Sequence, residues 1–364
     1  MKKIIFILML NLICNVQPYE QKIYLYSNNS HLKSNVTLAL DALNIKYESV
    51  NSIKQNDSEN LYIIFDLFKI HESMLPKYYI CYQTLDLSSN SLNNEYLKKL
   101  SNAIAVWDYS QENINKYRSK IYNYLYYPNN YEFIDPVVLP CILPISTLNK
   151  YKELLIYSNQ KDTDISSHLP TLFCIGIEKN PKIIVECGVR GGESTQAFRE
   201  IIQHTHANII GIDITPDCAA AYSNIPNSLF LCMNDLDFGN YYENSTFKDS
   251  KIDMVFIDTS HLYEHTLAEI KLFDTMLNNG GLIIFHDSNV TPLNNGTTYI
   301  RLNGTSGFAV GNTKGVTQAI KEFLSLSFDE SKYLNTTCIK NEYCWQIIHY
   351  PFCNGLTILK KQNI

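Results

Sequence analysis

Two carboxylates and two histidines lie where they could do acid–base or metal chemistry. Asp258 and His261 follow one apolar segment of the chain, and His286 and Asp287 follow the next. Two converging carboxylates could hold a hard cation such as Mg²⁺, which would lower the pKa of a hydroxyl group bound beside it. His261 could accept the proton, because imidazole titrates near neutral pH. The predicted catalytic residues are therefore His261 and Asp258. The predicted metal ligands are Asp258, His286 and Asp287.

A third histidine, His265, lies four residues after His261, a spacing that on one helix mimics a metal-binding pair. The sequence offers no third ligand at a suitable spacing, so we interpret His265 as a residue of a helix surface. This interpretation leaves the four residues named above as the predicted reactive group.

An acidic residue and a glycine-rich turn form a second candidate group. Its members are Glu186, Gly188, Gly191 and Gly192. Glycines allow a sharp turn and let the backbone approach a ligand where a Cβ atom would collide. Ser194 or Thr195 could cap the helix that is predicted to follow. A strand, a glycine turn and a helix in this order are typical of a crevice that binds a nucleotide-like ligand.

Five apolar segments would position these groups, because each ends in polar residues. They are residues 183–185, 209–212, 229–233, 252–257 and 282–285. Asp213 follows the second segment. It lies after Glu186 by somewhat more than the roughly 20 residues expected of a carboxylate that accepts ribose hydroxyls. Asn234 and Asp235 follow the third segment. Since helical patterns separate several segments, the predicted fold class is α/β, with a Rossmann-like doubly wound sheet and a ligand site at one edge.

The order of these motifs resembles class I S-adenosylmethionine-dependent methyltransferases, and within them the branch of cephalosporin hydroxylase-like proteins and macrolide-sugar O-methyltransferases. The resemblance covers roughly residues 165–350, including a late helix at 315–324. It implies that the glycine turn surrounds the methionine part of the cofactor, that Asp213 holds the ribose, and that Asn234 and Asp235 lie near the adenine. The implied cofactor-binding residues are Glu186, Gly188, Gly191, Gly192, Asp213, Asn234, Asp235 and Asp258.

The chain departs from that branch at the metal site. In the sugar methyltransferases that it resembles, an Asp-x-x-His pair matches Asp258 and His261, and two adjacent acids follow the fifth strand. Here His286 and Asp287 take the place of those acids. An imidazole in place of a carboxylate leaves three options open: Mg²⁺, a softer ion such as Mn²⁺, or no metal.

The resemblance implies O-methylation of a hydroxyl, with a small molecule, a sugar or a glycoconjugate as acceptor.

The composition suits two globular domains and disfavours nucleic-acid binding. The 364 residues are 45% hydrophobic, the net charge is −6, and the sequence has no block of Lys and Arg. Prolines within 135–144 break regular structure. We therefore predict a smaller N-terminal α/β domain at 21–145 and the methyltransferase domain at 146–364. The N-terminal domain weakly resembles the acceptor-side half of two-domain glycosyltransferases, and its Trp107 and Asp108 could bind a sugar.

Residues 1–20 resemble a signal peptide, because a basic start precedes an apolar run that is too short to span a membrane. Localisation stays open, since a signal favours export or membrane association whereas S-adenosylmethionine is made in the cytosol. Two alternative functions follow. One is a non-catalytic exported or envelope-associated binding protein, and the other is a glycan-processing protein led by the N-terminal domain. The sequence also leaves a homo-oligomer open.

Overall fold

The structure is a computed structural model of the chain. It describes residues 22–27, 36–37, 40–41, 45–65, 67–83, 94–108, 110–117, 120–126, 139–161, 163–289, 297–300, 306–309, 315–351 and 353–364. The signal-like segment at 1–20 lies outside these described residues. The chain divides into two compact units, the first ending at Lys161 and the second beginning at Asp162.

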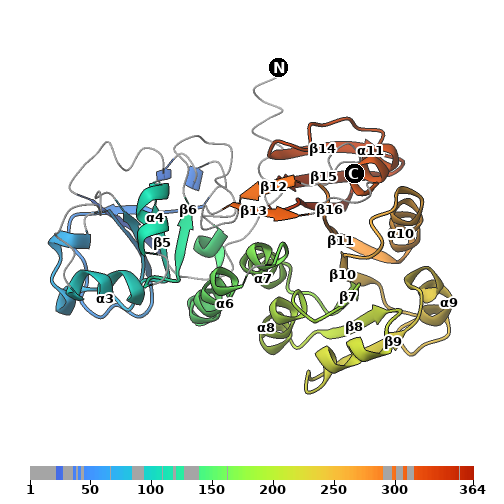
Figure 1. Ribbon diagram of the computed structural model, residues 1–364, viewed down its shortest axis with the longest axis horizontal. Coiled ribbons are helices and arrows are strands. Elements are labelled where there is room, and N and C mark those ends of the chain that lie inside the picture. The colour runs from blue at the N-terminus through green and yellow to red at the C-terminus, as the bar shows by residue number, and fades with distance from the viewer. Residues whose placement is uncertain are drawn as a thin grey trace. The chain divides into compact units, whose positions relative to one another are not determined.

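Six parallel strands form the sheet of the first unit, in the order β2-β1-β3-β4-β5-β6 (Figure 1). The strands are β1 (Ile23–Tyr26), β2 (Glu48–Val50), β3 (Leu61–Ile64), β4 (Tyr78–Gln83), β5 (Ala105–Asp108) and β6 (Tyr124–Tyr126). The helices are η1 (Leu67–Lys69), η2 (Glu72–Met74), α3 (Asn94–Asn102), α4 (Gln111–Tyr117), η4 (Leu139–Ile142), η5 (Ile145–Thr147) and α6 (Leu148–Gln160). This unit confirms the predicted second α/β sheet.

Strand β5 lies in the core of this unit, and all of its side chains are buried. Asp108 accepts hydrogen bonds from the backbone N–H of Ser110 at 2.8 Å and from the side-chain amide of Asn113 at 3.2 Å. Burial raises the pKa of Asp108 to about 7. The suggestion that Trp107 and Asp108 bind a sugar is therefore wrong, because neither side chain reaches the surface.

Helix α6 belongs to the first unit, although it follows the predicted boundary at residue 145. The Lys152 ammonium donates to the backbone carbonyl of Ser101 at 2.6 Å, and the Asn159 amide donates to the carbonyl of Tyr122 at 2.7 Å. Both acceptors lie in the first unit. These hydrogen bonds explain why that unit extends to Lys161.

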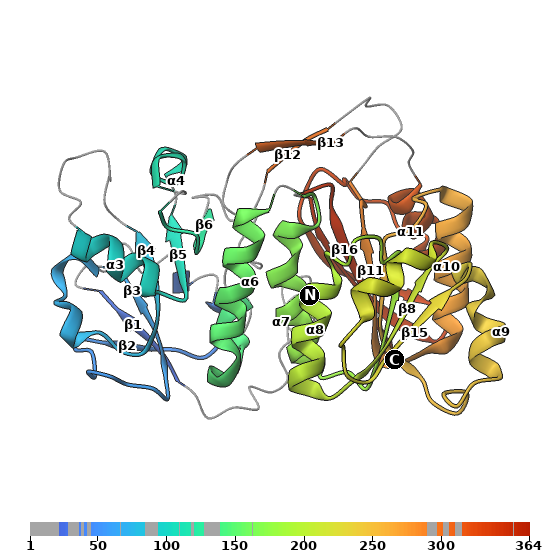
Figure 2. The same ribbon diagram turned by 60° about the horizontal axis from the view of Figure 1, so that its bottom comes forward.

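Eight strands form the sheet of the second unit, in the order β14-β15-β16-β11-β10-β7-β8-β9 (Figure 2). They are β7 (Ile183–Cys187), β8 (Asn208–Asp213), β9 (Ser228–Cys232), β10 (Ile252–Ile257), β11 (Leu277–His286), β14 (Leu334–Lys340), β15 (Tyr343–Tyr350) and β16 (Leu356–Asn363). A separate two-stranded sheet pairs β12 (Thr297–Ile300) with β13 (Ser306–Ala309). The helices are η6 (Ser166–His168), α7 (Leu169–Lys179), α8 (Thr195–Thr205), η7 (Pro216–Tyr222), η8 (Asp235–Asp237), α9 (Phe238–Glu243), α10 (Tyr263–Met276) and α11 (Val316–Leu324).

The five strands from β9 to β11 are parallel and correspond to the five predicted apolar segments. Their order reverses between β7 and β10, because β8 and β9 continue on one side of β7 while β11 continues on the other side of β10. Helices α7 and α8 cover one face of the sheet, and α9, α10 and α11 cover the other (Figures 1 and 2). The predicted doubly wound, Rossmann-like fold is confirmed. Such a reversal opens a crevice at the carboxyl ends of the strands.

The C-terminal strands are the main feature of this sheet that the sequence did not predict. β16 pairs antiparallel with β11, β15 with β16, and β14 with β15. β11 also begins earlier than predicted, at Leu277. A shift in its register between Ile252 and Met254 of β10 accommodates residues 278–281 within the strand.

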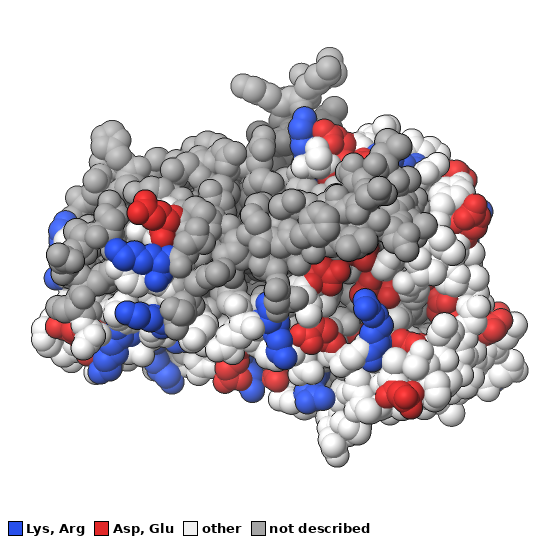
Figure 3. Space-filling view, viewed as in Figure 1, with Lys and Arg blue, Asp and Glu red and all other residues white. Residues whose placement is uncertain are grey.

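The surface of the described residues carries both signs of charge. Acidic and basic side chains are interspersed on the face that Figure 3 shows, and the described residues of that face form no continuous basic stripe. Within the described part of the chain, no helix is both long and apolar enough to cross a membrane.

Candidate functional site

The glycine turn is pressed against the end of β10 at the point where the strand order reverses. Gly188 has a φ of 84°, and a Cβ atom there would lie 2.1 Å from the backbone oxygen of Asp258. Backbone hydrogen bonds join the turn to the ends of both neighbouring strands, β8 and β10. The Gly188 N–H donates to Ile212 at 2.9 Å, and the Asp258 N–H donates to Cys187 at 2.9 Å. Only glycine allows this approach, so the turn and Asp258 share one edge of the sheet.

The other two glycines differ in how much space surrounds them. Gly192 has a φ of 78°, and a Cβ atom there would lie 2.6 Å from the Cβ atom of Ala221. A Cβ atom added at Gly191 would meet no described atom within 4 Å, apart from its chain neighbours. Gly192 is therefore needed for close packing, whereas Gly191 faces open space.

Glu186 lies beneath the turn and is fully buried. Its carboxylate accepts hydrogen bonds from the hydroxyls of Ser194 at 2.5 Å, Thr195 at 3.0 Å and Tyr222 at 2.5 Å. Burial raises its pKa to about 7, although these donors oppose the shift. The predicted helix cap is wrong in detail, because Ser194 makes no side-chain capping bond and its hydroxyl serves Glu186 instead. Glu186 thus fastens α8 and η7 under the turn, while its contact with a cofactor stays a prediction.

Asp213 is half-buried at the end of β8, beside the same turn. Its carboxylate accepts the backbone N–H groups of Arg190 at 3.0 Å and Thr215 at 2.9 Å. Burial would raise the pKa of Asp213, but these N–H donors outweigh it and lower the pKa below its usual value. An ionised carboxylate with a fixed orientation therefore faces the edge where a ribose was predicted.

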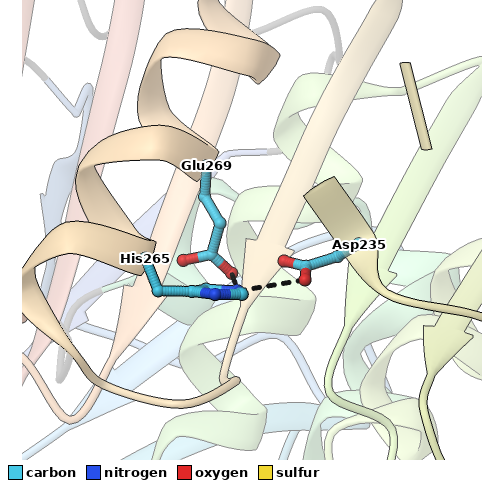
Figure 4. A group of neighbouring side chains, drawn as sticks. All are labelled: Asp235, His265 and Glu269. Carbon is cyan, nitrogen blue, oxygen red and sulfur yellow. Dashed lines mark hydrogen bonds and ion pairs between the residues drawn. The ribbon is translucent and has the colours of Figure 1, made fainter. Parts of the chain in front are cut away.

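Asn234 and Asp235 have different roles from each other. The Asn234 side chain accepts the backbone N–H of Leu236 at 2.9 Å and so caps η8. Asp235 is buried and turns toward helix α10, where its carboxylate lies 3.0 Å from Nε2 of His265, as Figure 4 shows. The carboxylate of Glu269 lies 3.5 Å from the same nitrogen atom. The side chain of Asp235 is therefore engaged inside the unit, and its predicted contact with an adenine stays untested.

Four residues form what we call the histidine–carboxylate cluster: Asp258, His261, His286 and Asp287. Nε2 of His261 lies 3.0 Å from Asp258, and its Nδ1 lies 3.3 Å from Asp287. Nδ1 of His286 lies 3.3 Å from Asp258 and 3.4 Å from Asp287. The structure thus brings together all four residues that the sequence singled out, with each imidazole bridging both carboxylates.

Mutual charge sets the protonation of this cluster. Burial would raise the pKa of Asp258, but the imidazoles of His286 and His261 hold it well below its usual range. Burial would lower the pKa of His286, but the carboxylates of Asp287 and Asp258 raise it to about 10. Burial would also lower the pKa of His261, but the same two carboxylates raise it. For Asp287, burial dominates and raises the pKa. Without a bound cation, protonated imidazole therefore balances the negative charge of the carboxylates in this cluster.

The geometry adds His261 to the side chains that could hold a cation. Ligand atoms of Asp258, His261 and Asp287 all lie within 4.8 Å of one another. His286 lies beneath this group, is 1% exposed, and packs its ring edge-on at 5.5 Å against His168. The group that could hold a cation therefore includes His261, while the predicted ligand role of His286 stays a prediction. The group fits a cation, because the buried Oδ1 atom of Asp287 accepts no hydrogen bond from the described residues and has only a 3.4 Å charge contact with Nδ1 of His286 among them.

Two residues of the cluster have backbones that favour glycine. His261 has a φ of 58° and Asp287 a φ of 54°. Such conformations cost roughly 1–3 kcal/mol each and are concentrated at functional sites, where the surrounding structure holds them. The strain places both side chains at the edge where β10 and β11 end.

Sequence reasoning missed Tyr222, Glu269 and the pairing of His265. Tyr222 follows Glu186 by 36 residues, and no local pattern links the two. Glu269 is four residues after His265, so the helical spacing could have found this pair. Instead, the sequence predicted that His265 belongs to a helix surface. That prediction is wrong, because the His265 ring contacts two buried carboxylates.

Residues 185–288 match the profile of a protein family described as a methyltransferase domain. The matched segment begins in β7 and ends just after Asp287. It therefore contains the glycine turn, Asp213 and the whole histidine–carboxylate cluster. A comparison of the sequence with curated proteins found no match.

Solved methyltransferase structures are similar to the chain at low identity. An O-methyltransferase from Bacillus cereus, in complex with SAH, is 15% identical, with a TM-score of 0.39 over 60% of this chain and 91% of that chain. A SAH-bound methyltransferase from Podospora anserina is 13% identical, with a TM-score of 0.40 over 76% and 100%. The methyltransferase MycE of mycinamycin biosynthesis, in complex with Mg, SAH and mycinamycin VI, is 13% identical, with a TM-score of 0.35 over 55% and 49%.

Similarities of this size carry no argument about function. The support for a methyltransferase domain therefore comes from the family match and the strand order. Both concern the second unit. The family match confirms the predicted resemblance of the C-terminal half of this chain to class I S-adenosylmethionine-dependent methyltransferases.

Proposed function

We propose that the second unit transfers a methyl group from S-adenosylmethionine to an oxygen atom of its acceptor. The observation that carries this proposal is the contact between Gly188 and the backbone of Asp258. It presses the glycine turn against the histidine–carboxylate cluster, so a cofactor on the turn and an acceptor at the cluster would meet at one edge of the sheet. When bound, S-adenosylmethionine supplies the methyl group as a sulfonium electrophile.

The glycine turn and Asp213 would hold the cofactor. At Gly191 a Cβ atom would meet open space, so a ligand can approach the backbone of the turn there. Asp213 is held by two backbone N–H groups, and its remaining lone pairs suit the hydroxyls of a ribose. Glu186 supports the turn from below. The chain's own residues would thus bind and orient the cofactor, and most of the rate would come from positioning.

His261 would accept the proton of the acceptor hydroxyl. An alkyl hydroxyl is a weak nucleophile until it loses its proton, so methylating it needs a base close by. Both ring nitrogens of His261 face carboxylates, at 3.0 and 3.3 Å, so the imidazole is held in place and its pKa is raised. To act as the base, it must first lose a proton and exchange one carboxylate contact for the acceptor.

A divalent cation on Asp258 and Asp287 would compete with the imidazolium for the same negative charge. Two carboxylates and one imidazole suit Mn²⁺ better than Mg²⁺, which prefers oxygen ligands alone. When bound, such an ion would polarise the acceptor hydroxyl. His261 cannot use one nitrogen both as a metal ligand and as the base, so its effect on metal affinity separates these two roles.

The proposed acceptor is a sugar or glycoconjugate hydroxyl. The support for a hydroxyl acceptor is that it requires a base and a charged cluster, which Asp258, His261 and Asp287 would supply. Methylating a more nucleophilic nitrogen or sulfur would need these residues less. A sugar also presents neighbouring hydroxyls that could bind a shared cation.

Calorimetric titration of the full chain with S-adenosylmethionine, with and without Mn²⁺ or Mg²⁺, tests the first step. We expect micromolar binding that Asp213→Ala abolishes. In a methyl-transfer assay with sugar acceptors, His261→Ala should lower the rate by roughly 10²–10⁴ if His261 is the base. Unchanged affinity in Asp213→Ala would remove the ribose assignment, and near-normal activity in His261→Ala would remove the base assignment.

A further inference from the structure

A second group of ligating side chains lies beside the first but shares no residue with it. We call Asp235, His265 and Glu269 the Asp235 cluster. Nε2 of His265 lies 3.0 Å from Asp235 and 3.5 Å from Glu269, and the Thr259 hydroxyl donates to Glu269 at 2.6 Å. Figure 4 shows His265 and Glu269 projecting from α10 toward Asp235, which begins η8 on the facing loop. The three side chains therefore converge from two separate elements.

The Asp235 cluster contains more acceptors than donors. Glu269 is 0% exposed and Asp235 is 7% exposed. One oxygen of each, Oδ2 of Asp235 and Oε2 of Glu269, accepts no hydrogen bond from any residue that the structure describes. Nε2 of His265 faces both carboxylates and can donate one proton to them. A buried acceptor without a partner costs roughly 1–3 kcal/mol, and a buried unpaired charge costs more.

We infer that the Asp235 cluster binds a divalent transition-metal ion. One ligand atom from each of the three residues lies within 4.8 Å of the other two, which allows all three to reach one ion. A set of one imidazole nitrogen and two carboxylate oxygens suits Mn²⁺ or Zn²⁺ and disfavours Mg²⁺. An ion would replace the shared proton and satisfy the orphaned oxygens. The His265 side chain is 22% exposed, which leaves a side from which the ion and a water ligand can enter.

The inferred ion would have a structural role, distinct from the proposed chemistry. It would tie the loop after β9 to the first turns of α10, the helix that follows β10. Thr259, which bonds to Glu269, directly follows Asp258. An ion in the Asp235 cluster would thus stiffen the segment that carries the proposed catalytic residues without contacting the reacting atoms. Ion binding to the folded state alone would also stabilise the unit.

Metal titration of the full chain tests this inference. The chain is stripped with a chelator, dialysed, and titrated with Mn²⁺ alone in a calorimeter, and the bound metal is counted by mass spectrometry. We expect Glu269→Gln, which keeps the size of the side chain, to remove one bound equivalent or to raise its Kd more than about tenfold. The matched control is Glu264→Gln, which changes the same charge on an exposed position of α10 and should bind as the wild type does.

His265→Ala provides a second variant that folding cannot easily obscure, because His265 is partly exposed. We expect it to lose the same equivalent as Glu269→Gln and to lose the rise in unfolding temperature that Mn²⁺ gives the wild type. Equal stoichiometry and Kd in the wild type, Glu269→Gln and His265→Ala would overturn the inference, as would a wild type that binds no metal there. Titration with S-adenosylmethionine in the same variants keeps this result separate from the proposed function.

Discussion

Gly188 and Gly191 offer a direct comparison at the scale of single residues. Gly188→Ala would force a Cβ atom to within 2.1 Å of the Asp258 carbonyl at a φ of 84°, whereas Gly191→Ala meets open space. We expect the first change to destabilise the second unit by roughly 2–5 kcal/mol and to abolish cofactor binding. The second should leave the fold unchanged. Thermal unfolding and calorimetric binding check both, and equal effects of the two variants would contradict the close approach.

Tyr222 and Tyr242 form another matched pair. Both are buried, but the Tyr222 hydroxyl donates to Glu186 at 2.5 Å, whereas the Tyr242 hydroxyl has no hydrogen-bond partner among the described residues. Tyr222→Phe removes a bond to a buried carboxylate and should lower the free energy of unfolding by roughly 1–3 kcal/mol. Tyr242→Phe should be neutral or slightly stabilising. Denaturant unfolding measures both, and an equal loss in the two variants would show that packing, not the bond to Glu186, decides.

Single residues differ in how far the sequence could predict them. Asp258, His261 and Asp287 were predictable as a group, because polar residues after neighbouring parallel strands meet at one edge. The position of His261 between the carboxylates of Asp258 and Asp287 was not, since it depends on left-handed backbones at His261 and Asp287. The bond between Tyr222 and Glu186 depends on how η7 packs, which no spacing encodes.

The antiparallel strands β15 and β16 carry a titratable group whose effect on stability can be measured. His349 of β15 is fully buried, with Nε2 2.8 Å from the Glu330 carbonyl oxygen and Nδ1 2.7 Å from the Thr357 hydroxyl. Burial lowers its pKa to about 4. Since the folded pKa lies below the unfolded one, the unfolded chain binds the proton first as the pH falls. The contribution of His349 is therefore complete above about pH 6.5 and is lost toward pH 4.

We expect this loss to reach roughly 3 kcal/mol between pH 7 and pH 4. His349→Gln cannot gain the proton, so its stability should fall less over the same range. Denaturant unfolding of both proteins at several pH values isolates the difference, because the other ionisable groups are common to both. Parallel curves would mean that His349 is not held neutral in the folded state.

The strands of the parallel sheet were predictable for a physical reason, whereas strand β14 and the place of helix α6 in the first unit were not. The runs 183–185 and 254–257 lie in strands that are buried on both faces, which their uninterrupted apolar character predicts. β14 runs along the edge of the sheet and its residues are mostly half-buried, so its sequence lacks such a run. Helix α6 lies beyond the prolines that suggested a boundary, and only its tertiary hydrogen bonds assign it to the first unit.

At the scale of the whole molecule, each unit has its own hydrophobic core. This limits how strongly the stability of one unit can depend on the other. One cluster of buried residues lies within 62–124 in the first unit, and another lies within 183–359 in the second. Each core has its own sheet and its own covering helices. A domain with its own core can fold as a unit, so ligand binding in the second unit should not stabilise the first directly.

Calorimetric unfolding of the full chain tests this independence. We expect two transitions, and S-adenosylmethionine should raise the midpoint of one of them only. At a ligand concentration of about 100 times Kd the stabilisation is about 2.7 kcal/mol, which corresponds to a shift of roughly 5–10 °C for a unit of this size. Asp213→Ala should remove the shift and leave the other transition in place. If a single transition moved as a whole, the two cores would be coupled, and the first unit would have to be counted as part of the folding unit that holds the proposed site.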